Sequence, residues 1–405
     1  MSEPLREIDA DGVVMGEAEI AAVNRALQKP LFLGENVAAM EERCSALLGK
    51  SHGVMVNSGS SALELAVEIL RLPPGSEVVT PVLTFSTTVA PLVRAGLVPA
   101  FVDVEPDTYN IDVDRIEEMI GPKTRALLIP HLIGNVPDWD RIREIADRHE
   151  LIVIEDSCDT LGARLRGRLT GERSDIAVTS FALTHIITAG GNGGLVAMND
   201  PELHDRALLL RRWGRSSEVR LFGSRQEERG RFIEDVDGIA YDALYVFREI
   251  GHNFEPSELG AAFGVAQLDQ LEANVAARRR HKALHDEFFR NYPDALIVPR
   301  ETEDAETSWL QYPLMVRPGA GFTRSDAQLF LKRKGITTRM VWTGNLLRQP
   351  GFRHIACRRA DAYPNADFAM ETSFVIPVHQ GLDEEDVRYV HRAFAELLDG
   401  GPEPA

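Results

Sequence analysis

The 405-residue chain has little cysteine, no long apolar segment and no excess of basic charge. Its three cysteines, Cys44, Cys158 and Cys357, are far apart, which argues against a disulfide framework or a CxxC metal motif and indicates a reducing compartment. No apolar run approaches the roughly 20 residues of a membrane span. The first residues are polar and acidic, unlike a secretion signal. We therefore expect a cytoplasmic protein without a membrane partner.

The charge balance is strongly acidic. The formal net charge is −18, from 44 lysines and arginines against 62 aspartates and glutamates. Nucleic acids and anionic membranes both favour basic surface, so neither is an expected partner. A pocket can still be locally basic, which leaves an anionic small molecule open as a ligand.

The first two thirds of the chain alternate between two patterns. Apolar runs rich in β-branched residues predict strands at 53–56, 77–80, 98–104, 126–130, 151–155, 176–180 and 195–198. Helical spacing predicts helices at 16–28, 37–48, 61–70, 113–120 and 139–149. This alternation predicts an α/β fold with a mostly parallel sheet covered on both faces, in which active groups lie at the carboxyl ends of the strands.

The remainder of the chain predicts a second, smaller α/β unit. A charged stretch at 215–240 is expected to be a surface excursion, and a helix is expected at 257–280. Beyond it, strands are expected at 309–316 and 337–341, and helices at 325–334 and 384–398. We predict a large domain over residues 1–285 and a small C-terminal domain over 286–405.

A phosphate site is predicted where the first strand meets a helix. The residues there are Asn57, Ser58, Gly59, Ser60 and Ser61. The free N–H groups and the dipole of a helix N-terminus favour a phosphate, and the hydroxyls of Ser60 and Ser61 are further donors. The alternative is an ordinary helix cap with a tight turn.

Further candidates follow other strands. Phe85 offers a flat apolar face for an aromatic ring, although a core phenylalanine is an equal alternative. Asp156 and Asp159 follow a buried strand, where solvated acids are the alternative. Ser180 ends another strand, and His185 comes five residues later. Imidazole moves protons near neutral pH, but a lone histidine is more often structural.

The segment around His185 resembles a known family. It reads Ser-Phe-Ala-Leu-Thr-His from Ser180, and then Gly-Gly-Asn-Gly-Gly from Gly190. This resembles the cofactor-lysine segment of the DegT/DnrJ/EryC1/StrS sugar aminotransferases, which read Ser-Phe-x-x-x-Lys and Gly-Glu-Gly-Gly. His185 stands at the lysine, a mark of the family's sugar 3-dehydratases. Counted back from the glycines, Ile186 takes that place. Neither count gives a lysine, and none occurs between Lys123 and Lys282.

The resemblance implies a pyridoxal-phosphate (PLP) enzyme of fold type I. It implies that Gly59, Ser60, Ser61 and Ser180 hold the cofactor phosphate, joined by Asn253 from the neighbouring subunit of a homodimer with shared active sites. Phe85 would stack on the pyridine ring and Asp156 would pair with its nitrogen, which keeps the ring able to accept electrons. Asp159 would lie near the ring hydroxyl.

A second stretch also resembles the lysine-less dehydratases. Residues 344–350, Gly-Asn-Leu-Leu-Arg-Gln-Pro, match their Gly-Asn-Leu-x-Arg-Gln-Pro signature. Arg339, Asn345 and Arg348 are candidates for binding an anionic substrate, with a surface role as the alternative. Some of these enzymes carry an iron–sulfur cluster on cysteines after a Trp-Gly-Arg stretch. Here Ser216 and Ser217 follow that stretch, and three cysteines cannot supply a Cys₄ site, so no metal or cluster is expected.

The resemblance implies removal of the C3 hydroxyl of a nucleotide-linked 4-keto-6-deoxyhexose. L-Glutamate would convert PLP to pyridoxamine phosphate (PMP), whose amine condenses with the sugar ketone, and His185 would act as the base. Two alternatives stay open. One is a lysine-less PLP enzyme acting on another amino sugar or a cyclitol. The other is a non-catalytic homologue that binds cofactor or sugar.

Overall fold

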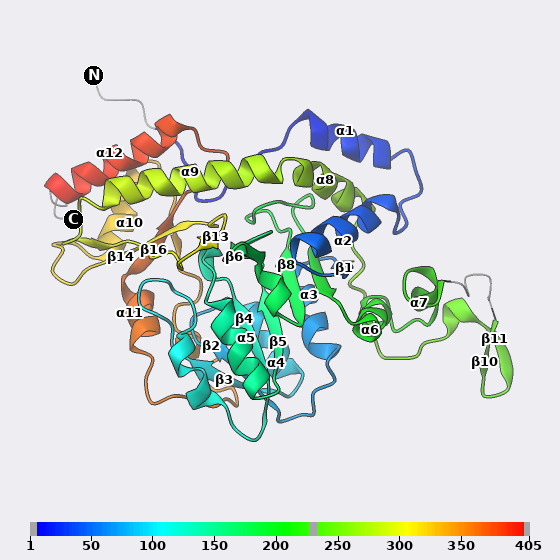
Figure 1. The fold of residues 1–405 in the computed structure, drawn as a ribbon. Helices are drawn as coiled ribbons and strands as arrows, with labels where there is room; N and C mark the ends of the chain where they lie inside the picture. The colour runs from blue at the N-terminus through cyan, green and yellow to red at the C-terminus, as the bar shows by residue number, and fades with distance from the viewer. Residues whose placement is uncertain (1–5, 227–232, 401–405) are drawn as a thin grey trace.

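The computed structural model describes residues 6–226 and 233–400, and a seven-stranded sheet forms its centre (Figure 1). The strand order is β1-β9-β8-β5-β4-β2-β3. The strands are β1 (His52–Val56), β2 (Glu77–Pro81), β3 (Val98–Val102), β4 (Thr124–Pro130), β5 (Ile152–Asp156), β8 (Ile176–Ser180) and β9 (Gly194–Met198). All seven coincide with strands expected from the sequence.

Only β9 runs against the others. It is antiparallel to both of its neighbours, β8 and β1, while β8, β5, β4, β2 and β3 pair in parallel. The reason lies in the connection: β8 and β9 are joined by the loop 181–193, which contains no crossover helix, so the chain must turn back. The carboxyl ends of the other strands therefore meet at one edge, as predicted for a mostly parallel sheet.

Helices cover both faces of this sheet. Alternate residues of β4 point to opposite sides: Ala126 and Leu128 join the core under α3 (Gly59–Glu68) and α6 (Pro201–Arg211), while Leu127 and Ile129 join the core under α5 (Trp139–Arg148). Helix α2 (Glu35–Leu47) and helix α8 (Glu258–Asp269) pack over the β9 end. No helix in the described part of the chain is long and apolar enough to cross a membrane.

A second sheet forms in the C-terminal part of the chain. Its order is β12-β14-β16-β15, all antiparallel, with bounds Leu296–Ile297, Tyr312–Val316, Ser373–Ile376 and Arg339–Met340. Its core includes Phe374 from the sheet, Phe394 from α12 (Glu384–Gly400) and Leu331 from α10 (Arg324–Arg333). Ile8 also belongs to this core, so the N-terminal segment packs with the C-terminal part. The division at 285/286 stays a prediction; helix α9 (Leu271–Phe289) runs across it unbroken.

Two sequence expectations were wrong in detail. Residues 113–120 form two short 3₁₀ turns, η1 (Val113–Arg115) and η2 (Glu117–Met119), because a capping Asp112 and the Gly-Pro pair at 121–122 leave too little chain for a stable α-helix. The helix expected at 257–280 is two helices, α8 and α9, interrupted at Gln270. The body also contains α1 (Glu17–Ala26), α4 (Ser86–Arg94) and α11 (Pro364–Thr372).

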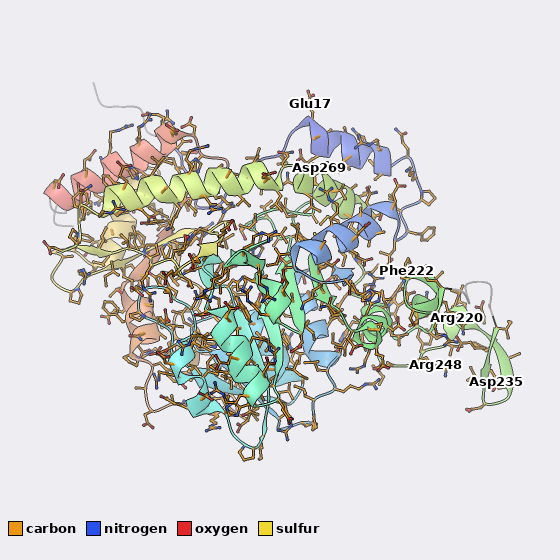
Figure 2. All side chains as sticks on the ribbon, in the orientation of Figure 1. Glu17, Arg220, Phe222, Asp235, Arg248 and Asp269 are labelled. Carbon is orange, nitrogen blue, oxygen red and sulfur yellow. The ribbon has the colours of Figure 1, made fainter. Side chains whose placement is uncertain are left out.

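An arm extends from the body between α6 and α8 (Figures 1 and 2). It carries α7 (Ser217–Leu221) and the hairpin β10–β11 (Ile233–Val236, Ile239–Asp242), while residues 227–232 of the expected excursion lie outside the described residues. Glu234 ties the arm together, because Arg220 and Arg248 both pair with its carboxylate. Several of its apolar side chains nevertheless face outward: Tyr245 and Phe247 are exposed, and Ile250 is 99% exposed.

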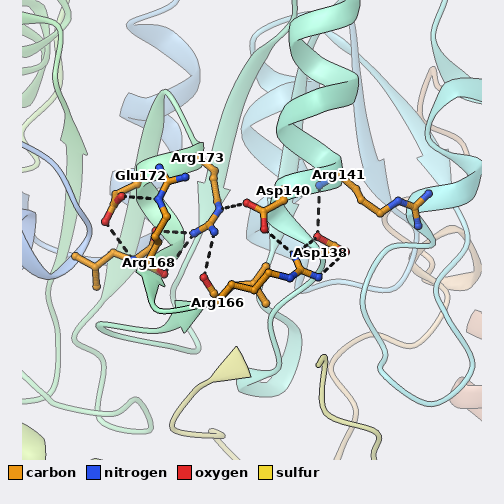
Figure 3. Close-up of polar contacts among 9 residues, drawn as sticks. Asp138, Asp140, Arg141, Arg166, Arg168, Glu172 and Arg173 are labelled. Carbon is orange, nitrogen blue, oxygen red and sulfur yellow. Dashed lines mark hydrogen bonds and ion pairs between the residues drawn. The ribbon is translucent and has the colours of Figure 1, made fainter. Parts of the chain in front are cut away.

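A charged network fixes the chain that follows the acidic end of β5 (Figure 3). Arg173 is 4% exposed and donates to Asp140 at 2.6 Å and to the carbonyl of Leu165 at 3.1 Å. Arg166, in the turn between β6 (Arg164–Leu165) and β7 (Arg168–Leu169), pairs with Asp138 and Asp140. Partial burial acts to raise the pKa of Asp140, but the two guanidiniums hold it below its usual value. The network anchors this small hairpin to the start of α5.

We expect acid to destabilise the C-terminal unit through His285. This residue is fully buried; Pro377 O accepts its Nε2–H at 3.0 Å, and its Nδ1 lies 3.0 Å from His391 Nε2. Burial, followed by the neighbouring His391, lowers the pKa of His285 to about 3. The unfolded chain, with a histidine pKa near ~6.5, then binds more protons between these values. The contribution of His285 to the free energy of unfolding is therefore fully present above the unfolded-state pKa. It decreases as the pH falls below that value, by ~2 kcal/mol at pH 5.

Urea unfolding at pH 7 and pH 5 checks this expectation. The slope of the unfolding free energy against pH counts the protons that the chain takes up on unfolding. His285→Gln should reduce that number by about one. His149→Gln is the matched control, because His149 is on the surface beside Glu117. An unchanged pH dependence in the His285 variant would contradict the assignment.

Candidate active site

A cavity of about 250 Å³ lies at the carboxyl ends of the parallel strands. Seven of the residues singled out from the sequence line it: Gly59, Ser60, Phe85, Asp156, Asp159, Ser180 and His185. They come from four separate segments of the chain. The sheet topology therefore brings together what the sequence only suggested.

The N-terminus of α3 forms one wall. Ser58 is the N-cap and accepts the N–H of Ser61 at 3.1 Å, while the first N–H groups of the helix have no intrahelical acceptor. A side chain at Gly59 would collide with Ser180, since a Cβ there would lie 2.7 Å from the Ser180 Cβ. Glycine thus lets the α3 terminus and Ser180 approach one another around a small polar concavity that suits a phosphate.

Asp156 is a buried acceptor at the end of β5. It is 5% exposed, accepts the hydroxyl of Thr88 at 2.8 Å and accepts the N–H of Cys158 at 3.1 Å. Thr88 of α4 and the backbone of Cys158, in the loop after β5, thus hold the two oxygens of the Asp156 carboxyl group in place. A fixed carboxylate at a cavity wall is suited to a cationic ring nitrogen.

Asp159 lies deeper, with its two oxygens in different environments. Oδ2 accepts the N–H of Ile133 at 2.9 Å and the indole Nε1–H of Trp342 at 3.0 Å. Oδ1 faces His185, 3.9 Å from its Nδ1. Burial, and then the charge of Asp156, raise the pKa of Asp159 to about 8. This acid therefore holds its proton at neutral pH until the surrounding charge changes.

His185 lines the same cavity from the loop after β8. Its side chain is 14% exposed, and its Nδ1 is shut away from solvent without a hydrogen-bond partner. Burial lowers the pKa of His185 to about 4, with a further contribution from the charge of Arg278, while the carbonyl of Cys158 opposes the shift. The imidazole is therefore neutral at pH 7, the form that can accept a proton.

The C-terminal part of the chain closes one side of the cavity. The Trp342 ring meets Phe85 edge-on, with ring centroids 5.5 Å apart. Thr343 Oγ1 donates to Thr84 O at 2.6 Å and Leu346 N to Val82 O at 3.0 Å, which dock this segment on the loop after β2. Phe85 itself is 48% exposed, so its ring is available for stacking.

The sequence did not identify every lining residue. His131 follows β4 and is held in one tautomer: Trp139 Nε1–H donates to its Nε2 at 2.7 Å, so Nδ1–H donates to Thr160 at 2.7 Å. Burial lowers the pKa of His131, which keeps it neutral. Trp342 stands within the stretch that resembled the dehydratases but was not selected. Ser58, named in the predicted phosphate site, also lines the cavity, and the remaining lining residues are Leu63, Thr84, Thr87, Thr88, Pro130, Leu132, Cys158, Ala182, Thr184 and Asn192.

Five candidates lie outside the cavity lining. Ser61 Oγ donates to Asn57 at 2.7 Å, and Asn253 is exposed beside Asn57 at the base of the arm. Arg339 is largely exposed, 3.6 Å from Asp11. Arg348 and Asn345 both bind Asp367 of α11. Their substrate and phosphate roles stay predictions.

These residues fit PLP. The cavity offers unpaired helix N–H groups and hydroxyls for a phosphate, a fixed carboxylate at Asp156 for a ring nitrogen and an exposed aromatic face at Phe85. Among the described residues no group of three or more potential ligands is placed to hold a metal ion.

Known proteins share this sequence and fold. The chain is 36% identical over 408 residues to dTDP-4-dehydro-2,6-dideoxy-D-glucose 3-dehydratase of Saccharopolyspora spinosa, covering 98% of this chain and 87% of that protein. It is 31% identical over 340 residues to GDP-4-keto-6-deoxy-D-mannose 3-dehydratase of Yersinia pseudotuberculosis, covering 82% and 84%. A solved Escherichia coli GDP-4-keto-6-deoxy-D-mannose-3-dehydratase with bound hydrated PLP has a TM-score of 0.85 at 25% identity, covering 96% and 100%.

The predicted fold class is confirmed: this is a PLP-dependent fold type I architecture with a large, mostly parallel sheet. The model of one family matches residues 13–395, nearly the whole described chain. Together with relatives above 30% identity over most of their length, this match is decisive. The chain therefore belongs to the DegT/DnrJ/EryC1/StrS aminotransferase family.

Proposed function

We propose that this protein is a PLP/PMP-dependent 3-dehydratase that removes the C3 hydroxyl of a nucleotide-linked 4-keto-6-deoxyhexose. The observation that carries the proposal is a neutral imidazole, His185, lining the cavity in a segment where the family pattern has lysine. A lysine amine would bind PLP covalently and favour amino transfer. An imidazole leaves the amino form of the cofactor free and supplies a base.

Each residue then has a role that its geometry supports. Bound as PMP, the cofactor supplies an amine for the sugar ketone and a ring that accepts electrons. Gly59, Ser60 and Ser180 bind the phosphate, and Asp156 keeps the ring nitrogen protonated. Phe85 orients the ring. His185 would act as the base toward the carbon next to the amine and would return a proton to the departing hydroxyl.

A second candidate is a lysine-less PLP enzyme acting on another amino sugar or a cyclitol. Asn192, which lines the cavity where the family pattern has glutamate, favours it.

We also propose a homodimer with shared active sites. The arm has exposed apolar side chains, including Tyr245, Phe247 and Ile250, which a second subunit would bury. Asn253, the residue expected to reach the neighbouring active site, lies at the base of this arm. Sedimentation should give the mass of two chains. Ile250→Asp should shift the equilibrium toward one chain, whereas Leu329→Asp, on the exposed side of α10, should not. Equal dissociation in both variants would contradict the placement of the interface.

Ammonia release tests the function. We expect the protein, with L-glutamate and PLP, to release ammonia from at least one member of a panel of nucleotide-linked 4-keto-6-deoxyhexoses, in step with a 3-deoxy-4-keto product. Protein purified without oxygen should turn over without iron or an added electron donor, since only three cysteines are present. Formation of an amino sugar in stoichiometric amount, without ammonia, would favour the second candidate. Iron that is present in stoichiometric amount and required for activity would contradict the proposal that no iron–sulfur cluster takes part.

A further inference from the structure

One carboxyl group in the cavity has no role in the scheme above. Asp159 is 8% exposed, its Oδ1 lies 3.9 Å from His185 Nδ1, and the charge of Asp156 acts on it. Both donors to its Oδ2 come from residues with left-handed backbone conformations, Ile133 at φ 58° and Trp342 at φ 43°. Such conformations are unfavourable for bulky or β-branched residues, by ~1–2 kcal/mol each. Two of them converging on one oxygen indicate a carboxyl group whose orientation is functionally constrained.

The constraint leaves the other oxygen aimed at His185. Oδ1 has no donor, and His185 Nδ1, 3.9 Å away, is buried without a partner. A buried polar atom without a partner, such as His185 Nδ1, is costly, and a modest closing movement would join it to Asp159 Oδ1. His185 lines the cavity. With Nδ1 turned toward Asp159, Nε2 is the ring nitrogen left for a ligand.

We propose that Asp159 is the positioning residue for His185: its Oδ1 accepts the imidazole Nδ1–H when cofactor fills the cavity, which leaves Nε2 as the nitrogen that exchanges protons. This inference rests on the proposed function of His185. Trp342 extends the arrangement to the C-terminal part of the chain, because its indole holds Asp159 from there. Docking of that segment thus sets the orientation of the base.

The charge of Asp156 links the Asp159–His185 pair to cofactor binding. Burial is the main cause that raises the pKa of Asp159, and the charge of Asp156 adds to it. A cationic ring nitrogen beside Asp156 would cancel that charge and so lower the pKa of Asp159, which favours its carboxylate form. That carboxylate then raises the pKa of His185 and fixes a proton on Nδ1.

The other titratable groups around the pair do not reverse this argument. On α9, Arg278 keeps a positive charge that lowers the pKa of His185. His131, after β4, stays neutral through burial, and burial raises the pKa of the Cys158 thiol, which stays protonated. Asp156 is therefore the neighbour whose effect on Asp159 changes when the cofactor binds.

Histidine ¹⁵N NMR tests the proposal without any sugar substrate. His185→Asn identifies the His185 signals among the 11 histidines. In the unaltered protein, PLP should raise the pKa of His185 by about one unit or more and place the proton on Nδ1. Asp159→Asn keeps the shape and can still accept from Ile133 and Trp342, but it carries no charge, so the rise should disappear. Trp342→Phe removes one donor and should give a smaller rise.

The same response to PLP in Asp159→Asn and in the unaltered protein would overturn the proposal. If Asp159→Asn does not fold, an unchanged response in Trp342→Phe overturns it instead. Failure of the ammonia assay with a normal NMR response would count against the proposed function and not against this pairing. A variant whose PLP affinity is retained while the His185 response is lost separates positioning from simple support of the cavity.

Discussion

Replacing His185 by asparagine is expected to lower the rate of dehydration on the order of 10²–10⁴-fold, the usual loss for a positioned acid–base group. Asparagine cannot accept a proton near neutral pH, and no lysine occurs between Lys123 and Lys282 to take over. PLP binding should be nearly unchanged, because Asp156, Ser60 and Ser180 would still hold the cofactor. Ammonia release and PLP titration measure the two effects separately.

His185→Lys is the informative companion. Its amine should capture PLP covalently, and borohydride should then fix a phosphopyridoxyl adduct that mass spectrometry assigns to residue 185. The unaltered chain should give no adduct on any lysine near the cavity. His149→Asn, at a surface site, is the control and should behave like the unaltered protein. Near-normal dehydration in His185→Asn would show that another group moves the proton, and Asp159 would be the next candidate.

The sheet was predictable from the sequence because its strands are buried. A strand covered on both faces reads as a continuous apolar run, so all seven runs were visible without any partner information. The reversed direction of β9 was not predictable from the sequence, because the apolar content of a strand does not indicate its direction in the sheet. The structure supplies the reason: the loop 181–193 contains no crossover helix, so the chain turns back beside β8.

The site was predictable wherever a polar residue follows a strand. Asp156, Ser180 and Gly59 fall at strand ends, so the topology alone gathers them. Trp342 and His131 were missed for a different reason. Trp342 reaches the cavity only because the segment after β15 docks on the loop after β2, a contact between residues more than 250 positions apart. Tertiary packing of that kind leaves no local pattern.

Two polar residues of the Gly-Asn-Leu-Leu-Arg-Gln-Pro stretch have a structural role in addition to the one suggested by the sequence. The sequence suggested that Asn345 and Arg348 bind substrate, whereas both hold Asp367 in this structure. The Arg348 hydrogen bond is the main cause that lowers the pKa of Asp367. This cluster fixes the segment that carries Trp342, so its spacing serves the cavity indirectly even without a substrate contact.

Asp156→Asn is expected to have an effect of similar size to the loss of His185, by a different route. The amide cannot balance a cationic ring nitrogen, and removing one partner of a buried charge pair costs ~3–5 kcal/mol, on the order of 10²–10⁴ in rate or affinity. Both PLP affinity and turnover should therefore fall, unlike the His185 variant, in which affinity is retained.

Thr88→Val separates the charge of Asp156 from its orientation. It removes the hydroxyl that donates to Asp156 at 2.8 Å but leaves the carboxylate and the Cys158 N–H bond in place. The loss of a hydrogen bond to a charged group is ~1.5–3 kcal/mol, so a decrease of roughly 10–100-fold is expected. Absorbance titration with PLP and thermal unfolding, run on both variants, distinguish lost binding from lost folding. If Asp156→Asn bound PLP as tightly as the unaltered protein, the ring nitrogen would have to be held elsewhere, and the orientation of the cofactor inferred from the cavity would be wrong.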